Sequence, residues 1–183
     1  MDDKERRPGL RNKVETAMRN FVREEQKLPL FGIGPYLVYG MVALTAAGIV
    51  VFSYILKTGI LSSPWVLIFR LAGLLLMASG AVIWFVGALR SEMDESIIAN
   101  RLKTDGIYAH VRNPMYSGIW IFSAGISLMW HNVWLLVTPV INWAIMTIVL
   151  KNTEEKWLLN LYGEEYANYK KRVNRCIPWK SRK

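Results

Sequence analysis

The chain has 183 residues, of which 52% are apolar and 20% charged, and its 23 Lys and Arg against 14 Asp and Glu give a net charge of +9. A basic excess is typical of nucleic-acid binders, but residues 33–89 hold only two charges and residues 113–150 hold none. A water-soluble domain does not easily leave such stretches uncharged, so the pattern excludes nucleic acid as the partner. The single cysteine, Cys176, excludes an intrachain disulfide, and we expect no metal site.

Four apolar stretches predict an all-α integral membrane protein with four transmembrane helices. The first two, residues 33–56 and 64–89, exceed the roughly 20 residues that a helix needs to cross a bilayer. The third and fourth, residues 114–130 and 133–150, are close to the lower limit of about 17 and are separated by only two residues. We interpret them as a tight helical hairpin that crosses and returns, the alternative being a re-entrant pair that does not cross fully.

The basic residues predict the orientation of these helices. Of the 23 Lys and Arg, 21 lie before the first stretch, between the second and third, or after Leu150, whereas the loops on the opposite side hold Lys57 alone. Basic loops stay in the cytoplasm, so both termini are expected there, in what we take to be a prokaryotic plasma membrane. Arg70, inside the second stretch, either reaches the outer interface or contacts a substrate.

Three segments organise the chain: residues 1–32, residues 33–89 with the first two spans, and residues 90–183 with a loop, the hairpin and C-terminal cytoplasmic helices. The first segment predicts an amphipathic helix on the cytoplasmic side, with apolar residues at helical spacing on one face. This helix either lies on the membrane surface or packs against the cytoplasmic part of the protein. The residues of its apolar face are Leu10, Val14, Ala17, Met18, Phe21 and Val22.

The loop before the third stretch is rich in residue types that bind ligands. Asn113 followed by Pro114 predicts a helix start, with the Asn side chain as its cap. The free amides of that helix end suit an anionic group, and Arg112 could add a bidentate grip on a carboxylate or phosphate. Tyr108 and Tyr116 could supply aromatic walls. The alternative is a plain loop at the membrane interface.

Two adjacent carboxylates, Glu154 and Glu155, follow the fourth stretch within about one helical turn. A carboxylate beside anionic lipid needs a cationic partner. That partner is either a Lys or Arg of this chain or the ammonium group of a bound ligand. The helix that carries both residues is expected to break near Gly163 and then restart.

The order of these motifs resembles a known family. Gly-Ile-Tyr at 106–108 and Arg-x-Pro-x-Tyr at 112–116 precede the hairpin, and Glu-Glu-x-x-Leu-x-x-x-Tyr-Gly-x-x-Tyr-x-x-Tyr at 154–169 and Arg-x-Ile-Pro at 175–178 follow it. This pattern is similar to that of the isoprenylcysteine carboxyl methyltransferases, a family of integral membrane methyltransferases that also includes phospholipid N-methyltransferases. The resemblance covers about residues 75–180.

The resemblance implies an enzyme that uses S-adenosylmethionine, held in a cytoplasmic pocket between the loop and the C-terminal helices. The acceptor would be lipophilic, a prenylcysteine-like carboxylate or a phospholipid amine, and membrane lipids would be partners. The implied catalytic residues are Arg112, Glu154 and Glu155. The implied cofactor-binding residues are Gly106, Ile107, Tyr108, Arg112, Asn113, Tyr116 and Glu154.

Two departures from the family pattern keep other hypotheses open. Asn113 stands where the family usually has histidine. In the eukaryotic carboxyl methyltransferases an arginine precedes the glutamates, whereas the nearest basic residue here is Lys151, which puts a carboxylate-binding role in question. The alternatives are a non-catalytic lipid-binding protein of the same fold and an NADPH-dependent enzyme similar to the sterol reductases.

Overall fold

The computed structural model describes residues 33–90, 96, 99 and 101–178, and within these residues all regular structure is helical. The expected amphipathic helix of residues 1–32 lies outside the described residues. The long helices are α2 (Gly34–Ile49), α3 (Trp65–Phe85), α5 (Pro114–Met129) and α6 (Val137–Asn152), and the shorter ones are α7 (Glu154–Tyr162) and α8 (Glu164–Arg172). Single turns continue or connect them: η2 (Val50–Ile55), η3 (Val86–Arg90), η4 (Gly106–Ala109) and η5 (Val133–Leu136).

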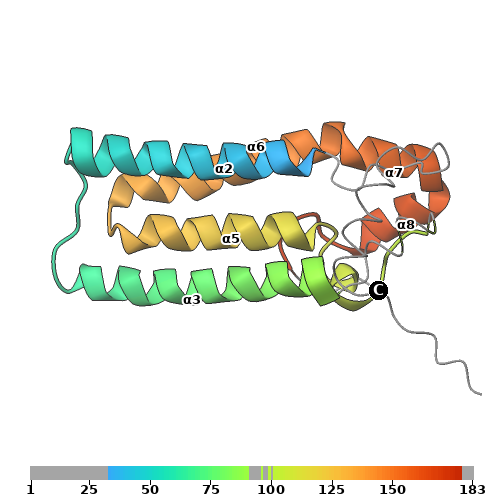
Figure 1. Ribbon diagram of the computed structural model, residues 1–183, viewed down its shortest axis with the longest axis horizontal. Coiled ribbons are helices and arrows are strands. Elements are labelled where there is room, and N and C mark those ends of the chain that lie inside the picture. Colours follow the sequence, from blue (N-terminus) through green and yellow to red (C-terminus); the bar gives the residue numbers. More distant parts are fainter. Residues whose placement is uncertain (1–32, 91–95, 97–98, 100, 179–183) are drawn as a thin grey trace, which may run out of the picture.

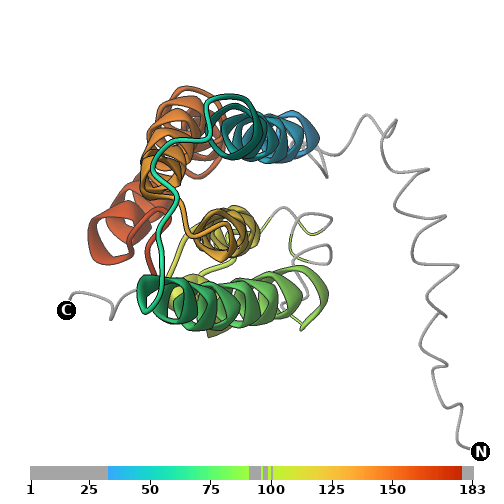
Figure 2. The same ribbon diagram turned by 90° about the vertical axis from the view of Figure 1, so that its left-hand side faces the viewer.

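The four long helices run side by side along the long axis of the molecule (Figure 1). Viewed from one end, α5 lies in the middle, with α3 on one side and with α2 and α6 on the other (Figure 2). Helices α7 and α8 gather at the end where α2 and α5 begin and where α3 and α6 finish. The polar segments of the chain therefore meet at one end of an apolar bundle.

Within the described part of the chain, three helical stretches are long and apolar enough to cross a bilayer: Gly34–Ile55, Trp65–Arg90 and Val133–Tyr162. They overlap the first, second and fourth of the expected spans, and the prediction of an all-helical membrane protein is confirmed. The third expected span is helical over Pro114–Met129, but this helix has only 16 residues. A fourth crossing therefore stays a prediction.

Helices α3 and α5 are in contact along their backbones because glycines line both faces of the interface. A Cβ atom built on Gly80 would lie 2.5 Å from the backbone nitrogen of Phe122, and one on Gly125 would lie 2.6 Å from the carbonyl oxygen of Gly73. Neither position has room for a side chain. Small residues stabilise membrane helix pairs in this way, because they let the backbones approach and pack closely.

On its other side α5 is joined to the bundle by buried polar groups. Ser127 Oγ lies 2.9 Å from Thr138 Oγ1 on α6, and the indole nitrogen of Trp120 donates to the carbonyl oxygen of Pro139 at 2.8 Å. Asn142 on α6 donates in turn to Thr45 Oγ1 on α2 at 3.1 Å. These hydrogen bonds fix the positions of α2 and α6 relative to α5. They therefore also fix the positions of the ends of these three helices.

We expect Gly80→Ala to lower the free energy of unfolding by about 1–3 kcal/mol, because the added methyl group meets backbone atoms that cannot move aside. The matched control is Gly40→Ala on α2, where a Cβ meets nothing within 4 Å. The measurement is unfolding of the purified protein by sodium dodecyl sulfate in mixed micelles. Equal effects of the two substitutions would contradict the close α3–α5 contact.

Candidate active site

The C-terminal segment after α8 returns to the start of α5 and binds it through the backbone. The backbone nitrogen of Arg112 donates to the carbonyl oxygen of Asn174 at 2.9 Å, and that of Asn113 donates to the carbonyl oxygen of Arg175 at 3.2 Å. The prediction that the Asn113 side chain caps α5 is wrong, since its amide donates to the same Arg175 carbonyl at 3.1 Å. The returning C-terminal segment places the Arg175 carbonyl next to the Asn113 side chain, so this side chain bonds to that segment and does not cap α5.

Glu155 is the centre of a buried cluster of charges. Its side chain is 3% exposed, and Oε1 lies 2.9 Å from Nη1 of Arg112, whose side chain is 7% exposed. Arg175 donates to both carboxylate oxygens, from Nε to Oε1 and from Nη2 to Oε2 at 3.1 Å. Lys170 Nζ lies 3.4 Å from Oε2. The expected cationic partners of Glu155 are thus side chains of this chain, and three cations share one carboxylate.

The cluster also determines the protonation of its neighbours. The hydrogen bond from Arg175 to Glu155 raises the pKa of the Arg175 guanidinium further above its usual range, despite partial burial. Burial, assisted by the negative charge of Glu155, raises the pKa of Tyr166 to about 12. Tyr166 is therefore a neutral phenol at physiological pH. Its hydroxyl accepts a hydrogen bond from Nη1 of Arg112 at 3.1 Å.

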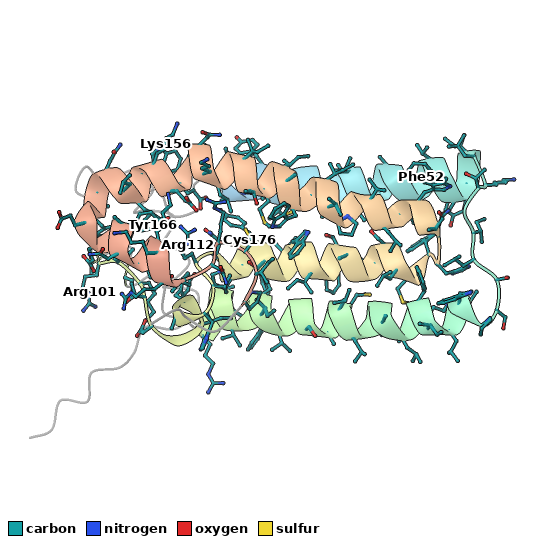
Figure 3. The ribbon with its side chains drawn as sticks, turned by 180° about the vertical axis from the view of Figure 1, so that it is seen from behind. Phe52, Arg101, Arg112, Lys156, Tyr166 and Cys176 are labelled. Carbon is teal, nitrogen blue, oxygen red and sulfur yellow. The ribbon has the colours of Figure 1, made fainter. Side chains whose placement is uncertain are left out.

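A pocket opens beside this cluster, between the loop before α5 and the two C-terminal helices. Its empty space is about 400 Å³ when the open mouth is included. Figure 3 shows Arg101, Arg112 and Tyr166 at this same end of the bundle, opposite Phe52. The lining residues are Arg101, Leu102, Lys103, Tyr108, Arg112, Asn113, Leu158, Tyr162, Tyr166 and Tyr169.

Two details of the pocket indicate what it can hold. Nε of Arg112 is buried and has no hydrogen-bond partner among the described residues, so one donor of this guanidinium is unsatisfied. Tyr169 donates to the backbone carbonyl oxygen of Tyr108 at 2.6 Å, which ties the Tyr169 side chain to the turn that carries Tyr108, and both residues line the pocket. A pocket of cations and phenol rings suits an anionic group that is joined to a planar or cationic one.

Glu154 has different surroundings from its neighbour Glu155. The hydroxyl of Tyr116 donates to Glu154 Oε1 at 2.6 Å, and the backbone of Ile33 lies near the same carboxylate. Within the part of the chain that the structure describes, no Lys or Arg forms an ion pair with Glu154. Successive residues on a helix point about 100° apart, so the two glutamates face different sides of α7.

The structure brings some of the expected site residues together and separates others. Tyr108, Arg112 and Asn113 line the pocket, but Gly106 and Ile107 from the same turn as Tyr108 are not among its lining residues. Tyr116 and Glu154 form a separate pair with each other. Sequence reasoning did not assign site roles to the other groups of the pocket and the charge cluster, although Arg175 and the three tyrosines stand in the quoted motifs. These groups are Arg101, Lys103, Tyr162, Tyr166, Tyr169, Lys170 and Arg175.

The described helices thus form an apolar bundle with a cationic, tyrosine-lined pocket at its end. The sequence profile of the phospholipid methyltransferase family matches residues 66–165, which is more than half of the chain. The chain therefore belongs to this family, and the expected resemblance is confirmed.

The chain is similar over a shorter region to several characterised enzymes. Protein-S-isoprenylcysteine O-methyltransferase of Schizosaccharomyces pombe is 37% identical over 78 residues, or 42% of this chain and 33% of that protein. Methanethiol S-methyltransferase 1 of Bradyrhizobium diazoefficiens is 35% identical over 82 residues, or 44% and 27%. The human isoprenylcysteine enzyme is 33% identical over 92 residues, or 47% and 30%. Each match spans a third of the relative or less.

We expect Glu155→Gln to lower the free energy of unfolding by about 3–5 kcal/mol, because it leaves buried guanidinium groups without their counter-charge. The matched control, Glu164→Gln, removes an exposed carboxylate from the start of α8 and should change that free energy by about 0.5 kcal/mol or less. Both are measured by sodium dodecyl sulfate titration in mixed micelles. An equally small change for Glu155→Gln would mean that the cluster does not hold the C-terminal segment in place.

Proposed function

We propose that this protein is an integral membrane methyltransferase that uses S-adenosylmethionine to methylate a lipophilic acceptor. The observation that carries the proposal is the pocket beside Arg112, which combines a spare buried guanidinium donor with tyrosine walls. Membership of the phospholipid methyltransferase family supports it. The two alternatives, a lipid-binding protein without activity and an NADPH-dependent reductase, have no specific observation in their favour.

The residues of the pocket fit the chemical groups of S-adenosylmethionine, which are a carboxylate, an ammonium, a sulfonium and an adenine ring. Arg112 Nε, with Lys103 and Arg101 in the same lining, suits the carboxylate. The faces of Tyr108 and Tyr166 suit the adenine ring or the sulfonium, since aromatic faces stack on rings and attract cations. We therefore assign donor binding to Arg112, Asn113 and Tyr108, with Gly106 and Ile107 forming the turn that carries Tyr108.

The two glutamates have different parts in this proposal. The bound donor supplies an activated methyl group on a sulfonium sulfur, which becomes a neutral thioether when an acceptor lone pair takes the methyl group. An amine acceptor must also lose a proton. Glu155 is held by three cations and is a poor proton acceptor, so its part is to orient Arg112. Glu154, without an ion pair among the described residues, is our candidate to take the proton.

The same environment favours one kind of acceptor over another. A carboxylate acceptor would bring a second negative charge next to Glu154, and no described cation forms an ion pair there to offset the repulsion. A phospholipid amine carries a proton that Glu154 can take and, while protonated, a charge that Glu154 attracts. Between the two acceptors that we expect from the sequence, the site therefore favours the amine.

We also propose that the chain crosses a prokaryotic plasma membrane four times with both termini in the cytoplasm. Helix α5 is about 24 Å long at 1.5 Å per residue, shorter than the roughly 30 Å of a bilayer core. Its position between α3 on one side and α2 and α6 on the other means that protein, rather than lipid, surrounds much of it. The pocket then faces the cytoplasm, and the acceptor can enter from the lipid.

The proposal is tested with the purified protein in detergent, labelled S-adenosylmethionine and a total lipid extract. We expect transfer of the labelled methyl group into lipid and binding of S-adenosylhomocysteine by calorimetry. Arg112→Gln should weaken that binding by about 10-fold or more, because a charge-assisted hydrogen bond is lost. The control Lys156→Gln removes an exposed charge from α7 and should leave binding unchanged. No binding by the wild-type protein at millimolar ligand would refute the proposal.

Glu154→Gln should reduce methyl transfer by about 100-fold or more and leave S-adenosylhomocysteine binding within about threefold of wild type. The physical reason is that an amide cannot take a proton, while Glu154 is not among the residues that line the donor pocket. Initial rates with labelled donor and calorimetric titration separate the two effects. A variant that loses donor binding as well would show that Glu154 holds the donor rather than the acceptor.

A further inference from the structure

The first turn of α2 contacts Tyr116, the hydrogen-bond partner of Glu154, although α2 lies outside the residues matched by the family profile. Gly34, the first residue of α2, is buried against the ring of Tyr116. A Cβ atom at this position would lie 2.8 Å from Tyr116 Oη, and 3.3 and 3.5 Å from the two nearest ring carbons. The tightest contact is therefore with the hydroxyl that donates to Glu154.

The end of α2 also contacts Glu154 directly. The backbone of Ile33, which immediately precedes α2, lies close enough to the Glu154 carboxylate to favour its charged form. The first N–H groups of a helix have no partner within the helix and carry a partial positive charge. The helix end thus stabilises the negative charge of a carboxylate that forms no ion pair in the described part of the chain. Three helices, α2, α5 and α7, meet at this one group.

Helix α2 cannot move away to make room for a side chain at position 34. Leu37 and Met41, one and two turns further on, pack in a buried apolar cluster with Met146 and Leu150 of α6. The hydrogen bond from Asn142 to Thr45 holds the next turn. A methyl group at position 34 would therefore displace the Tyr116 hydroxyl and leave α2 where it is.

We propose that Gly34 is a positioning residue for methyl transfer: its missing side chain leaves space for the Tyr116 hydroxyl, which together with the start of α2 holds the Glu154 carboxylate toward the acceptor. The inference rests on the proposed role of Glu154. Under this proposal, the first turn of α2 forms part of the site next to Glu154, where the acceptor binds. The donor pocket does not depend on it, because neither Gly34, Tyr116 nor Glu154 is among the residues that line that pocket.

The test is a double-substitution cycle with Gly34→Ala and Tyr116→Phe, singly and together. Each single variant should lower kcat by about 10-fold or more, because the carboxylate loses its position, with an unchanged KM for the donor. The double variant should match Tyr116→Phe alone within about twofold, because the hydroxyl that the new methyl group displaces is already absent. Gly40→Ala on the same helix, in open space, is the matched control and should keep the wild-type kcat.

Thermal unfolding midpoints of the same proteins test the contact without any assay of activity. Gly34→Ala should lower the midpoint when residue 116 is Tyr and leave it nearly unchanged when it is Phe. An equal loss of kcat or of midpoint in both backgrounds would overturn the inference, as would a Gly34→Ala variant with wild-type kcat. Failure of the proposed function itself would be visible separately, as an absence of methyl transfer by the wild-type protein.

Discussion

The ion pairs of Glu155 with Arg112 and Arg175 are the interaction on which the arrangement of the polar end depends. They join α7, the segment before α5 and the returning C-terminal segment, three parts of the chain that are far apart in sequence. A buried carboxylate beside two guanidinium groups is stable only as a complete set, because each charge has lost its hydration. The pocket wall formed by Arg112 and Tyr166 depends on these ion pairs, because Glu155 holds the guanidinium of Arg112, which in turn donates to the Tyr166 hydroxyl.

The adjacent glutamates divide the end of the bundle into two sides. On one side, cations outnumber carboxylates and tyrosines line an open pocket. On the other, Glu154 meets Tyr116 and the start of α2, with apolar helices leading away into the bundle. Methyl transfer between a water-soluble donor and a lipid-soluble acceptor needs two approaches to one reacting centre, and placing the groups accounts for most of the acceleration. In the function that we propose, both approaches meet at one end of α7.

The helices and their polar end could be predicted from the sequence, because apolar length and the positions of Lys and Arg report them directly. The close packing of α3 on α5 could not, since Gly80 and Gly118 reveal their contact only when the two helices are paired in space. The different surroundings of Glu154 and Glu155 were also beyond prediction. Their partners Tyr116 and Arg175 come from other parts of the chain, and only the fold decides which glutamate each one meets. The motif around Asn113 predicted a ligand loop but an incorrect partner for that side chain.

The most direct test of this account is an experimental structure of the protein with S-adenosylhomocysteine bound. We predict that the ligand lies in the pocket lined by Tyr108 and Tyr166, with its carboxylate within hydrogen-bonding distance of Arg112 Nε. Glu155 should keep its ion pairs, and Glu154 should not contact the ligand carboxylate or adenine. A ligand bound elsewhere in the bundle, or bound with Arg112 turned away from it, would contradict the account.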